Sequence, residues 1–279
     1  ILLDSLQKIC LMHGIEVDYY KKLFQTAGNI IELIEKDDIP KYLLFLENVF
    51  PYMDNYNYQK GMKAILQELK NFLKRKDIGT DSDRALLLDF QATLEIKPEK
   101  AMKLEKDALA LITEITEDNA HLVSNLHSNL GGLYRMNGYP DLAMEHMEKG
   151  LFLLEQYNLL YTHDGIPQAT NYAMFLTEQQ APEKGISVLQ KLSKSIKEYN
   201  SDCCLDYATV QETLGTIYLM IANLPQAKTH FKKACKIYEK IWADEPEMIE
   251  KKYLEIQELY PQVGYFLGQQ ISNFLTKQT

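Results

Sequence analysis

One regular spacing constrains this sequence more than any other feature. Small side chains recur at Gly131, Ala173 and Gly215, so that each step covers 42 positions. The same step separates a second series of small side chains, Ala143, Gly185 and Ala227, and a series of larger ones, Tyr134, Leu176 and Tyr218. A fixed period of this size is typical of a solenoid, in which each unit buries its apolar face only against its neighbours.

The repeat extends from these copies towards the N-terminus. One step back from Ala143 reaches Ala101, and the same step from Gly150 reaches Ala108, so a further copy covers about residues 82–115. A looser copy lies around Val49, Tyr52 and Gly61. Small residues let two helices approach closely, so each copy of the repeat predicts one helical hairpin. We therefore predict five hairpins over residues 41–242 and capping helices at 243–279.

Proline marks the turn inside each of the last four predicted hairpins. It occurs at Lys97-Pro98, Asn137 to Pro140, Ala181-Pro182 and Asn223 to Pro225. The first turn of a helix tolerates proline, because the N–H group that proline lacks has no partner there. Each of these turns therefore predicts the start of the second helix of a pair.

This pattern resembles the tetratricopeptide repeat, in which a small residue is followed three positions later by a large one and further along by Gly or Ala. The usual period of that repeat is about 34 residues. The longer period here resembles a subclass with longer helices, found in kinesin light chains and in bacterial peptide-pheromone receptors. The resemblance implies an all-α fold, a right-handed superhelical solenoid of tetratricopeptide-like helical hairpins.

The N-terminal stretch carries a second pattern. Leu3, Leu6, Ile9 and Cys10 repeat at helical spacing, and Gly14 ends the run. Residues 1–26 resemble the last part of a helix-turn-helix domain of the lambda-repressor-like class, and residues 27–40 read as a linker helix. The resemblance implies that the helices that enter the major groove of DNA would precede Ile1. The alternative is that residues 3–24 form the first hairpin of the solenoid.

Composition limits the classes of function. The chain has a formal net charge of −9, which argues against nucleic acid bound over a broad face, because phosphate contacts need clustered Lys and Arg. No apolar run approaches the roughly 18 residues that span a bilayer, and no signal peptide is evident, so we expect a cytoplasmic protein. The four cysteines form no C-x-x-C pair, and we expect free thiols.

Motifs for catalysis and metal binding are absent from the sequence. No two of the six histidines have the i, i+4 spacing of a helical metal site. No nucleophile elbow, P-loop or dinucleotide fingerprint is present. We therefore expect no enzyme activity, no metal and no cofactor.

The expected binding surface is the groove lined by the first helix of each hairpin. In tetratricopeptide proteins the positions two before and one after the small residue of that helix face the groove. An Asn carboxamide there offers a donor and an acceptor to the backbone of an extended peptide. The predicted peptide-binding residues are Asn125, Asn129, Arg135, Met136, Thr170, Asn171, Met174, Thr177, Glu178, Thr213, Thr216 and Met220. The alternative for Asn129 and Asn171 is hydrogen bonding between neighbouring repeats.

The N-terminal pattern followed by the long repeats resembles one group of regulators. That group is the pheromone-responsive proteins of Gram-positive bacteria, which include the Rgg, PlcR and NprR types. This implies a homodimeric transcriptional regulator in which a short signalling peptide in the groove controls an N-terminal DNA-binding domain. DNA would be contacted only through that upstream domain. The alternative is a tetratricopeptide adaptor that binds a protein partner and has no role at DNA.

Overall fold

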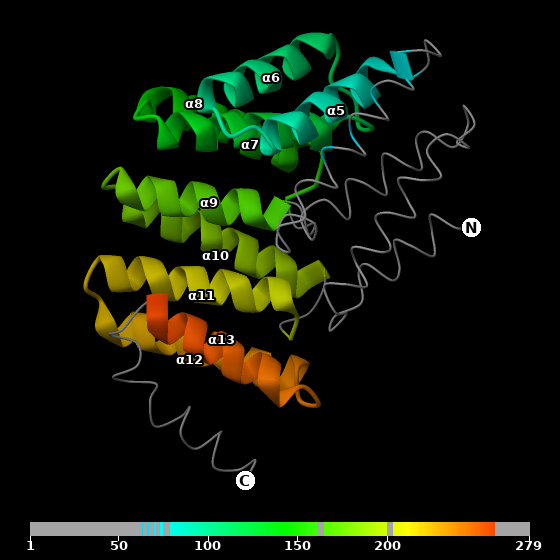
Figure 1. Cartoon of the computed structure of the whole chain (residues 1–279). Coiled ribbons are helices and arrows are strands. Elements are labelled where there is room, and N and C mark those ends of the chain that lie inside the picture. The colour runs from blue at the N-terminus through cyan, green and yellow to red at the C-terminus, as the bar shows by residue number, and fades with distance from the viewer. Residues whose placement is uncertain are drawn as a thin grey trace. The chain divides into compact units, whose positions relative to one another are not determined.

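The computed structural model describes residues 63, 66, 70, 73, 74, 79–160, 165–199 and 203–259 (Figure 1). This part of the chain is helical and contains no strand, so the predicted all-α fold is confirmed. The predicted helix-turn-helix tail at 1–26 and the linker helix at 27–40 lie outside the described residues. The helices are α5 (Asp81–Thr93), α6 (Pro98–Leu111), α7 (Ala120–Met136), α8 (Pro140–Gln156), α9 (Gly165–Glu178), α10 (Pro182–Tyr199), α11 (Leu205–Met220), α12 (Leu224–Ile241) and α13 (Pro246–Leu259).

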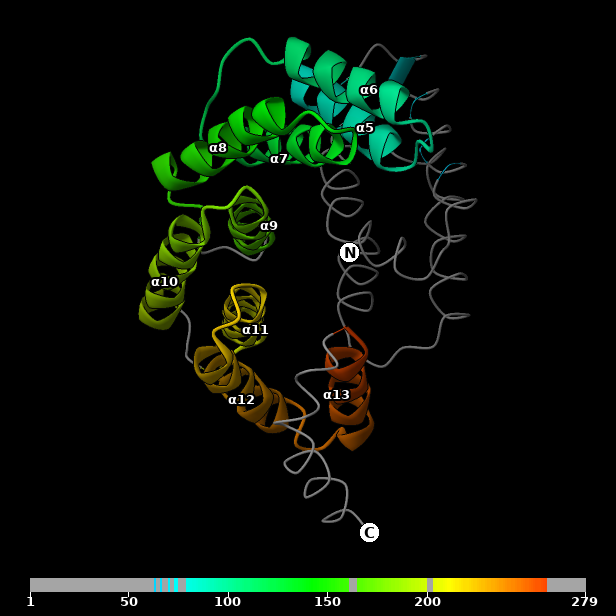
Figure 2. The same cartoon turned by 90° about the vertical axis from the view of Figure 1, so that its left-hand side faces the viewer.

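The chain divides into two compact units, residues 1–153 and 154–279. In the N-terminal unit α5 packs on α6, and α7 contacts both. In the C-terminal unit α10 packs on α9, α12 packs on α11, and α9 also contacts α11. Figure 2 shows α9 and α11 in one layer and α10 and α12 in a second layer. This is the arrangement of successive hairpins in a helical repeat solenoid.

The helix starts follow from the local sequence. Thr80 caps α5 with a capping box, because its hydroxyl accepts from Asp83 N at 3.1 Å and Asp83 Oδ2 accepts from Thr80 N at 2.6 Å. Asn223 caps α12 by accepting a hydrogen bond from Gln226 N. The helices α6, α8 and α10 each begin at a predicted turn proline, and Pro225 is the second residue of α12, so the prolines mark the starts of these second helices as predicted.

The small residues of the repeat lie where two helices of a hairpin meet. A Cβ atom added to Gly185 of α10 would lie 2.5 Å from the carbonyl oxygen of Ala173 in α9. A Cβ at Gly131 of α7 would lie 2.6 Å from Cγ of Met147 in α8, and one at Gly215 would lie 2.9 Å from the ring of Phe231. Real Cβ atoms do not approach this closely, so glycine permits the spacing of these helices.

The turns between paired helices also repeat. Gly138, Gln180 and Ala222 occupy the same repeat position after α7, α9 and α11, and each has a positive φ angle, of 77°, 62° and 58°. A residue in this left-handed conformation ends a helix, because the backbone N–H groups that follow can then bond to the last carbonyl groups of that helix. No helix in the described part of the chain is long and apolar enough to cross a membrane.

Candidate functional site

The first helices of the C-terminal unit, α9 and α11, share one partly exposed stripe. On α9 it contains Asn171, Met174 and Glu178, which are three or four positions apart and therefore share a face. The residues one repeat later, on α11, include Thr213, Thr216 and Met220, of which Met220 is 49% exposed. Because α9 and α11 contact each other, the two halves of this stripe lie side by side. We call it the α9–α11 face.

Asn171 is the polar side chain of this face that is most available to a ligand. It is exposed, and it forms no hydrogen bond with any residue that the structure describes. Its carboxamide therefore retains both N–H donors and its acceptor oxygen. Met174 beside it is half-buried and provides an adaptable apolar surface.

The threonines of the predicted site donate their hydroxyl protons to their own helices. Thr170 Oγ1 donates to Pro167 O at 2.9 Å, and Thr177 Oγ1 donates to Ala173 O at 2.9 Å. Thr216 Oγ1 donates to Glu212 O at 3.0 Å, and Thr213 Oγ1 donates to Thr209 O at 2.9 Å. Thr170, Thr177 and Thr216 are also buried, so only the half-buried Thr213 of these four reaches the surface.

In the N-terminal unit the predicted residues lie along α7. Asn125, Asn129 and Met136 share one face, and Met136 is 82% exposed. Asn125 Nδ2 lies 3.4 Å from Nε2 of His121. Arg135 is exposed beside Met136. Asn125, Asn129 and Met136 therefore share one face of α7, and Arg135 lies to one side of that face.

Asn129 also belongs to a hydrogen-bonded group that joins three helices. Its Nδ2 donates to Oδ1 of Asp89 in α5 at 2.7 Å. The pKa of Glu105 in α6 is raised to about 10, mainly by burial and then by the charge of Asp89 and a hydrogen bond with it, while a hydrogen bond with Asn129 acts in the opposite direction. Glu105 is therefore a neutral acid at pH 7 beside the Asp89 carboxylate.

Asp89 and Glu105 were not predicted from the sequence. A signal for Glu105 was present, because it lies between Ala101 and Ala108, two small residues of the repeat on the packed face of α6. A carboxyl group on a face that must pack against another helix needs a partner. Spacing alone does not reveal that the partner is Asp89 in the preceding helix.

Two histidines that are far apart in the sequence meet in the α7–α8 hairpin. Nδ1 of His127 lies 2.9 Å from Nδ1 of His146, so one ring donates and the other accepts. The pKa of His127 is lowered to about 4, mainly by burial and also by the charges of His146 and Lys149. Among the described residues, no three His, Cys, Asp or Glu side chains gather closely enough to hold a metal ion.

The same arrangement recurs two repeats later. Nδ1 of His230 lies 2.9 Å from Oε1 of Gln211, which has the repeat position of His127. His146 packs on Tyr134 and His230 on Tyr218, each with ring centres 5.3 Å apart. Since the two groups contain different hydrogen-bond partners in equivalent places, we interpret both as packing contacts within hairpins.

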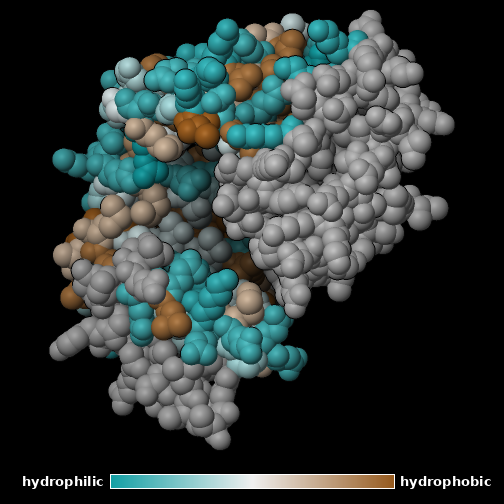
Figure 3. All heavy atoms as spheres, in the orientation of Figure 1, coloured by the Kyte–Doolittle hydropathy of each residue, from teal (hydrophilic) through white to brown (hydrophobic). Residues whose placement is uncertain are grey.

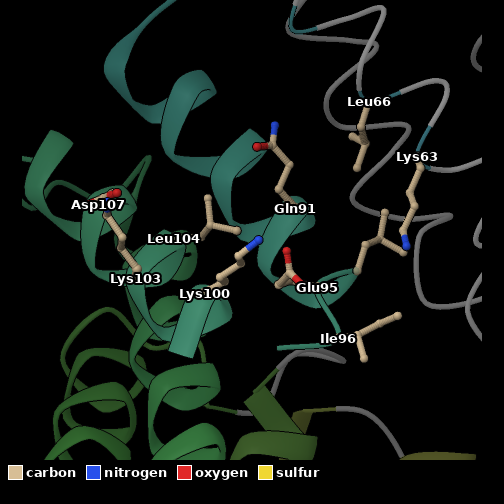
Figure 4. Close-up of a pocket in the computed structure, with 10 residues that line it drawn as sticks. Lys63, Leu66, Gln91, Glu95, Ile96, Lys100, Lys103, Leu104 and Asp107 are labelled. Carbon is tan, nitrogen blue, oxygen red and sulfur yellow. The ribbon is translucent and has the colours of Figure 1, made fainter. Parts of the chain in front are cut away.

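A pocket of about 670 Å³ lies in the N-terminal unit, against α5 and α6. Figure 4 shows Lys100 of α6 reaching towards Gln91 of α5 and towards Glu95, which follows that helix, with Lys63 and Leu66 across the pocket. A hydrogen bond from the backbone N–H of Lys97 lowers the pKa of Glu95, and the charges of Lys100 and Lys63 contribute. The lysines of the pocket therefore face a carboxylate of the pocket itself, and this pocket was not predicted from the sequence.

The surface in the orientation of Figure 1 mixes chemical classes. In Figure 3, brown, tan and teal residues alternate over the described part of this side, without one large apolar area. Single apolar side chains are common on protein surfaces and need no partner.

Comparisons with known proteins agree with this fold. The sequence profile of the tetratricopeptide repeat family matches residues 166–240, and a search of curated proteins found no match. BtubC (BKLC) from P. vanneervenii has a TM-score of 0.58 at 17% identity, covering 79% of this chain and 90% of its own. A Rap protein complexed with Competence and Sporulation Factor has a TM-score of 0.54 at 17% identity, covering 99% of this chain and 79% of its own.

A putative kinesin light chain of Podosopora anserina, with nearly identical TPR-like repeats, has a TM-score of 0.52 at 12% identity. It covers 83% of this chain and 100% of its own. At these identities the likeness concerns the fold alone. The repeat profile identifies residues 166–240 as tetratricopeptide repeat, and the likeness to these structures agrees with a helical repeat solenoid.

Proposed function

We propose that this chain binds an extended peptide on the α9–α11 face, with Asn171 pairing with the peptide backbone. The observation that carries the proposal is the exposed Asn171 carboxamide, which has no hydrogen-bond partner among the described residues. A peptide N–H and C=O group can satisfy both sides of one carboxamide. Met174 and Met220 on the same face supply apolar contact to peptide side chains.

The Rap protein supports this choice of ligand. That protein is complexed with Competence and Sporulation Factor, and the structural likeness extends over 99% of the present chain. A protein of similar overall fold is therefore found in complex with such a factor. For the present chain we assign a short signalling peptide as the ligand.

The proposal extends to transcription. Residues 1–26, which resemble the last part of a helix-turn-helix domain, support a DNA-binding domain that the peptide controls. Control requires that the peptide binds two conformations of the regulator with different affinities. A homodimer would place two such domains on one operator, whose half-sites are spaced by the dimer.

A second candidate function is that of an adaptor that holds a segment of a larger protein. The turn between α11 and α12 favours it, because Met220, Ile221 and Leu224 are 49%, 40% and 50% exposed there. Exposed apolar side chains that lie together are typical of protein interaction sites. In that case the ligand is longer and contacts the turn as well as Asn171.

A selection experiment tests whether the chain binds a peptide and whether Asn171 takes part. A random heptapeptide library is selected on the 279-residue chain, and the best peptide is titrated by calorimetry into the wild type and the Asn171→Ala variant. Loss of one charge-neutral hydrogen-bonding side chain should weaken binding about tenfold. Gln190→Ala, an exposed amide on α10, is the matched control and should leave the affinity unchanged.

If no heptapeptide is enriched, or if Asn171→Ala binds as tightly as the wild type, the proposed site is wrong. Enrichment of apolar peptides whose binding depends on Ile221 and Leu224 but not on Asn171 would favour the adaptor.

A further inference from the structure

The second-helix layer of the C-terminal unit concentrates positive charge. The helices α10 and α12 together carry nine lysines and three glutamates, with no arginine or aspartate, a formal charge of +6. The entire chain has a formal charge of −9. The first helices of the same unit, α9 and α11, carry no Lys or Arg and three acidic residues. The charges are therefore separated between the two layers.

The lysines of α12 form a row on its exposed side. Lys228, Lys232, Lys236 and Lys240 are four positions apart, so their Cα atoms rise about 6 Å from one to the next along the same face. Three of the four are exposed and Lys232 is half-buried. The opposite side of α12 is buried, with Ala227, Phe231 and Tyr238 in the core.

The lysines of α10 also lie on the exposed side of their helix. Lys184, Lys191 and Lys194 are exposed and lie on the side opposite to buried Leu189, Leu192 and Ile196. Lys194 Nζ lies 3.8 Å from Oε1 of Glu198, and both of these side chains are exposed. An exposed pair of this kind contributes little free energy in water, and Glu198 is already counted in the charge of +6.

One lysine of α10 and one lysine of α12 lie over the ring of Tyr207 in α11. Lys197 Nζ of α10 lies 5.3 Å from the centre of the Tyr207 ring, and Lys233 Nζ of α12 lies 4.9 Å from it. Lys233 also donates a hydrogen bond of 2.7 Å to Tyr207 Oη. Burial raises the pKa of Tyr207, yet hydrogen bonds with Lys233, Ser193 and Lys197 outweigh that effect and lower it. One lysine from each helix therefore lies at the same tyrosine. We call the exposed lysines of α10 and α12 together the lysine face.

We propose that the lysine face binds the phosphate backbone of nucleic acid without reading its sequence. The surface suits phosphate because interfaces with nucleic acid are strongly positive and polar, whereas interfaces between proteins are depleted of lysine. Among the described residues of α10 and α12, Leu224 is the one large apolar side chain that is exposed. The face thus lacks the apolar anchors that a protein interface or membrane insertion needs.

This interaction is separate from the proposed peptide site. The lysine face belongs to the second-helix layer, and Asn171 belongs to the first-helix layer. The chain itself would then contact DNA or RNA, in addition to any contact made by a domain upstream. Lysines without arginine act as point charges, so the binding should be independent of base sequence and sensitive to salt.

The test uses fluorescence anisotropy of a labelled 20-base-pair duplex of random sequence, titrated with the 279-residue chain at 50 mM and 200 mM salt. The variant replaces Lys228, Lys232, Lys236 and Lys240 with Gln. The control replaces Lys97, Lys100, Lys103 and Lys149 of the N-terminal unit with Gln, which makes the same change in net charge. Exposed substitutions of this kind leave folding nearly unchanged, which a thermal unfolding curve checks.

We expect the wild type to bind with a Kd of about 10⁻⁴ to 10⁻⁶ M near physiological salt. The α12 variant should bind at least about tenfold more weakly, with a salt slope that is shallower by about 0.9 for each phosphate that it no longer neutralises. The control variant should bind as the wild type does. Both variants should bind the selected heptapeptide normally.

Equal loss of DNA binding in both variants would show that only net charge matters, and it would overturn the assignment to the lysine face. Binding that does not weaken with salt would overturn it as well. Polyglutamate and vesicles containing anionic lipid are titrated in parallel. If the α12 variant loses binding to either of them while the wild type binds no DNA, the partner is an acidic protein or a membrane surface, and the proposal fails.

Discussion

Asn129 of α7 donates a 2.7 Å hydrogen bond from Nδ2 to Oδ1 of Asp89 in α5. Asp89 is 7% exposed and Glu105 is 1% exposed, so this bond satisfies a carboxylate that has little access to water. The equivalent residue one repeat later, Asn171, has no such partner among the described residues. Two asparagines at the same repeat position therefore have different surroundings, and this difference leads to the first prediction.

Asn129→Ala should lower the free energy of unfolding, whereas Asn171→Ala should not. Removal of the Asn129 carboxamide leaves the buried Asp89 carboxylate with one donor fewer, which destabilises a protein by about 1–3 kcal/mol. Asn171 is an exposed side chain, and its replacement should change the stability by less than about 0.5 kcal/mol. Urea unfolding of both variants measures this. Equal effects on stability would mean that Asn129 contributes no hydrogen bond between repeats.

Glu105→Gln should make stability less dependent on pH. Glu105 has a pKa of about 10 when folded, above its ordinary value of 4.5, so the folded chain holds a proton that the unfolded chain releases. Its contribution to stability is complete below pH 4.5 and is lost as the pH rises from there towards 10. Gln is neutral at every pH and can donate to Asp89. The variant should therefore gain stability relative to the wild type between pH 5 and pH 9, measured by urea unfolding at several pH values; a constant difference would contradict the protonated state of Glu105.

His127→Gln should remove part of the loss of stability in mild acid. The folded pKa of His127 is about 4, below the ordinary value of 6.5, so the unfolded chain binds a proton first as the pH falls. This lowers the stability of the wild type between pH 6.5 and 4, by about 1–2 kcal/mol after allowance for partial exposure. Gln is the natural residue at the equivalent position 211, where it contacts His230. Thermal unfolding at pH 7 and pH 5 should show a smaller shift for the variant, and an equal shift in both proteins would rule out His127 as the cause.

Gly185→Ala should destabilise the chain, and Gly132→Ala should stabilise it. A methyl group at Gly185 would meet the carbonyl oxygen of Ala173 at 2.5 Å, which is backbone that cannot turn aside. Forced separation of packed helices typically costs about 1–3 kcal/mol. At Gly132, also within a helix, nothing lies within 4 Å of the added methyl group, and alanine is the better helix former by about 1 kcal/mol. Opposite signs in urea unfolding would confirm that close approach of helices, and not helix propensity, explains the small residue at Gly185.

The fold could be predicted from the sequence because the information that specifies it is periodic. The small residues at a constant spacing predict close helix pairs, and Gly185 beside Ala173 shows the physical reason. The prolines predict the starts of the second helices, as α10 at Pro182 illustrates. The small-residue spacing and the turn prolines agree with the structure because both depend only on the two helices of one hairpin.

The candidate site was less predictable because its details depend on which side chains meet. The sequence pattern predicts Thr177 in the groove, yet its hydroxyl donates to Ala173 O and the side chain is buried. The lysine face was also not predicted from the sequence, because the net charge of the whole chain is negative and does not show where the lysines cluster. The lysines of α10 and α12 lie about one repeat apart in the sequence, and only the packing of both helices on α11 brings Lys197 and Lys233 to one tyrosine.

Hydrogen–deuterium exchange of the chain with and without the selected heptapeptide locates the peptide-binding surface, because it reports which backbone segments the ligand protects. We expect slower exchange in α9 (Gly165–Glu178) and α11 (Leu205–Met220) when the peptide is bound, and no change in α10 or α12. At a peptide concentration near the wild-type Kd, the Asn171→Ala variant should show much weaker protection, because its affinity is about tenfold lower. Protection confined to α10 and α12, or to the pocket beside α5 and α6, would contradict the assignment of the α9–α11 face as the peptide-binding surface.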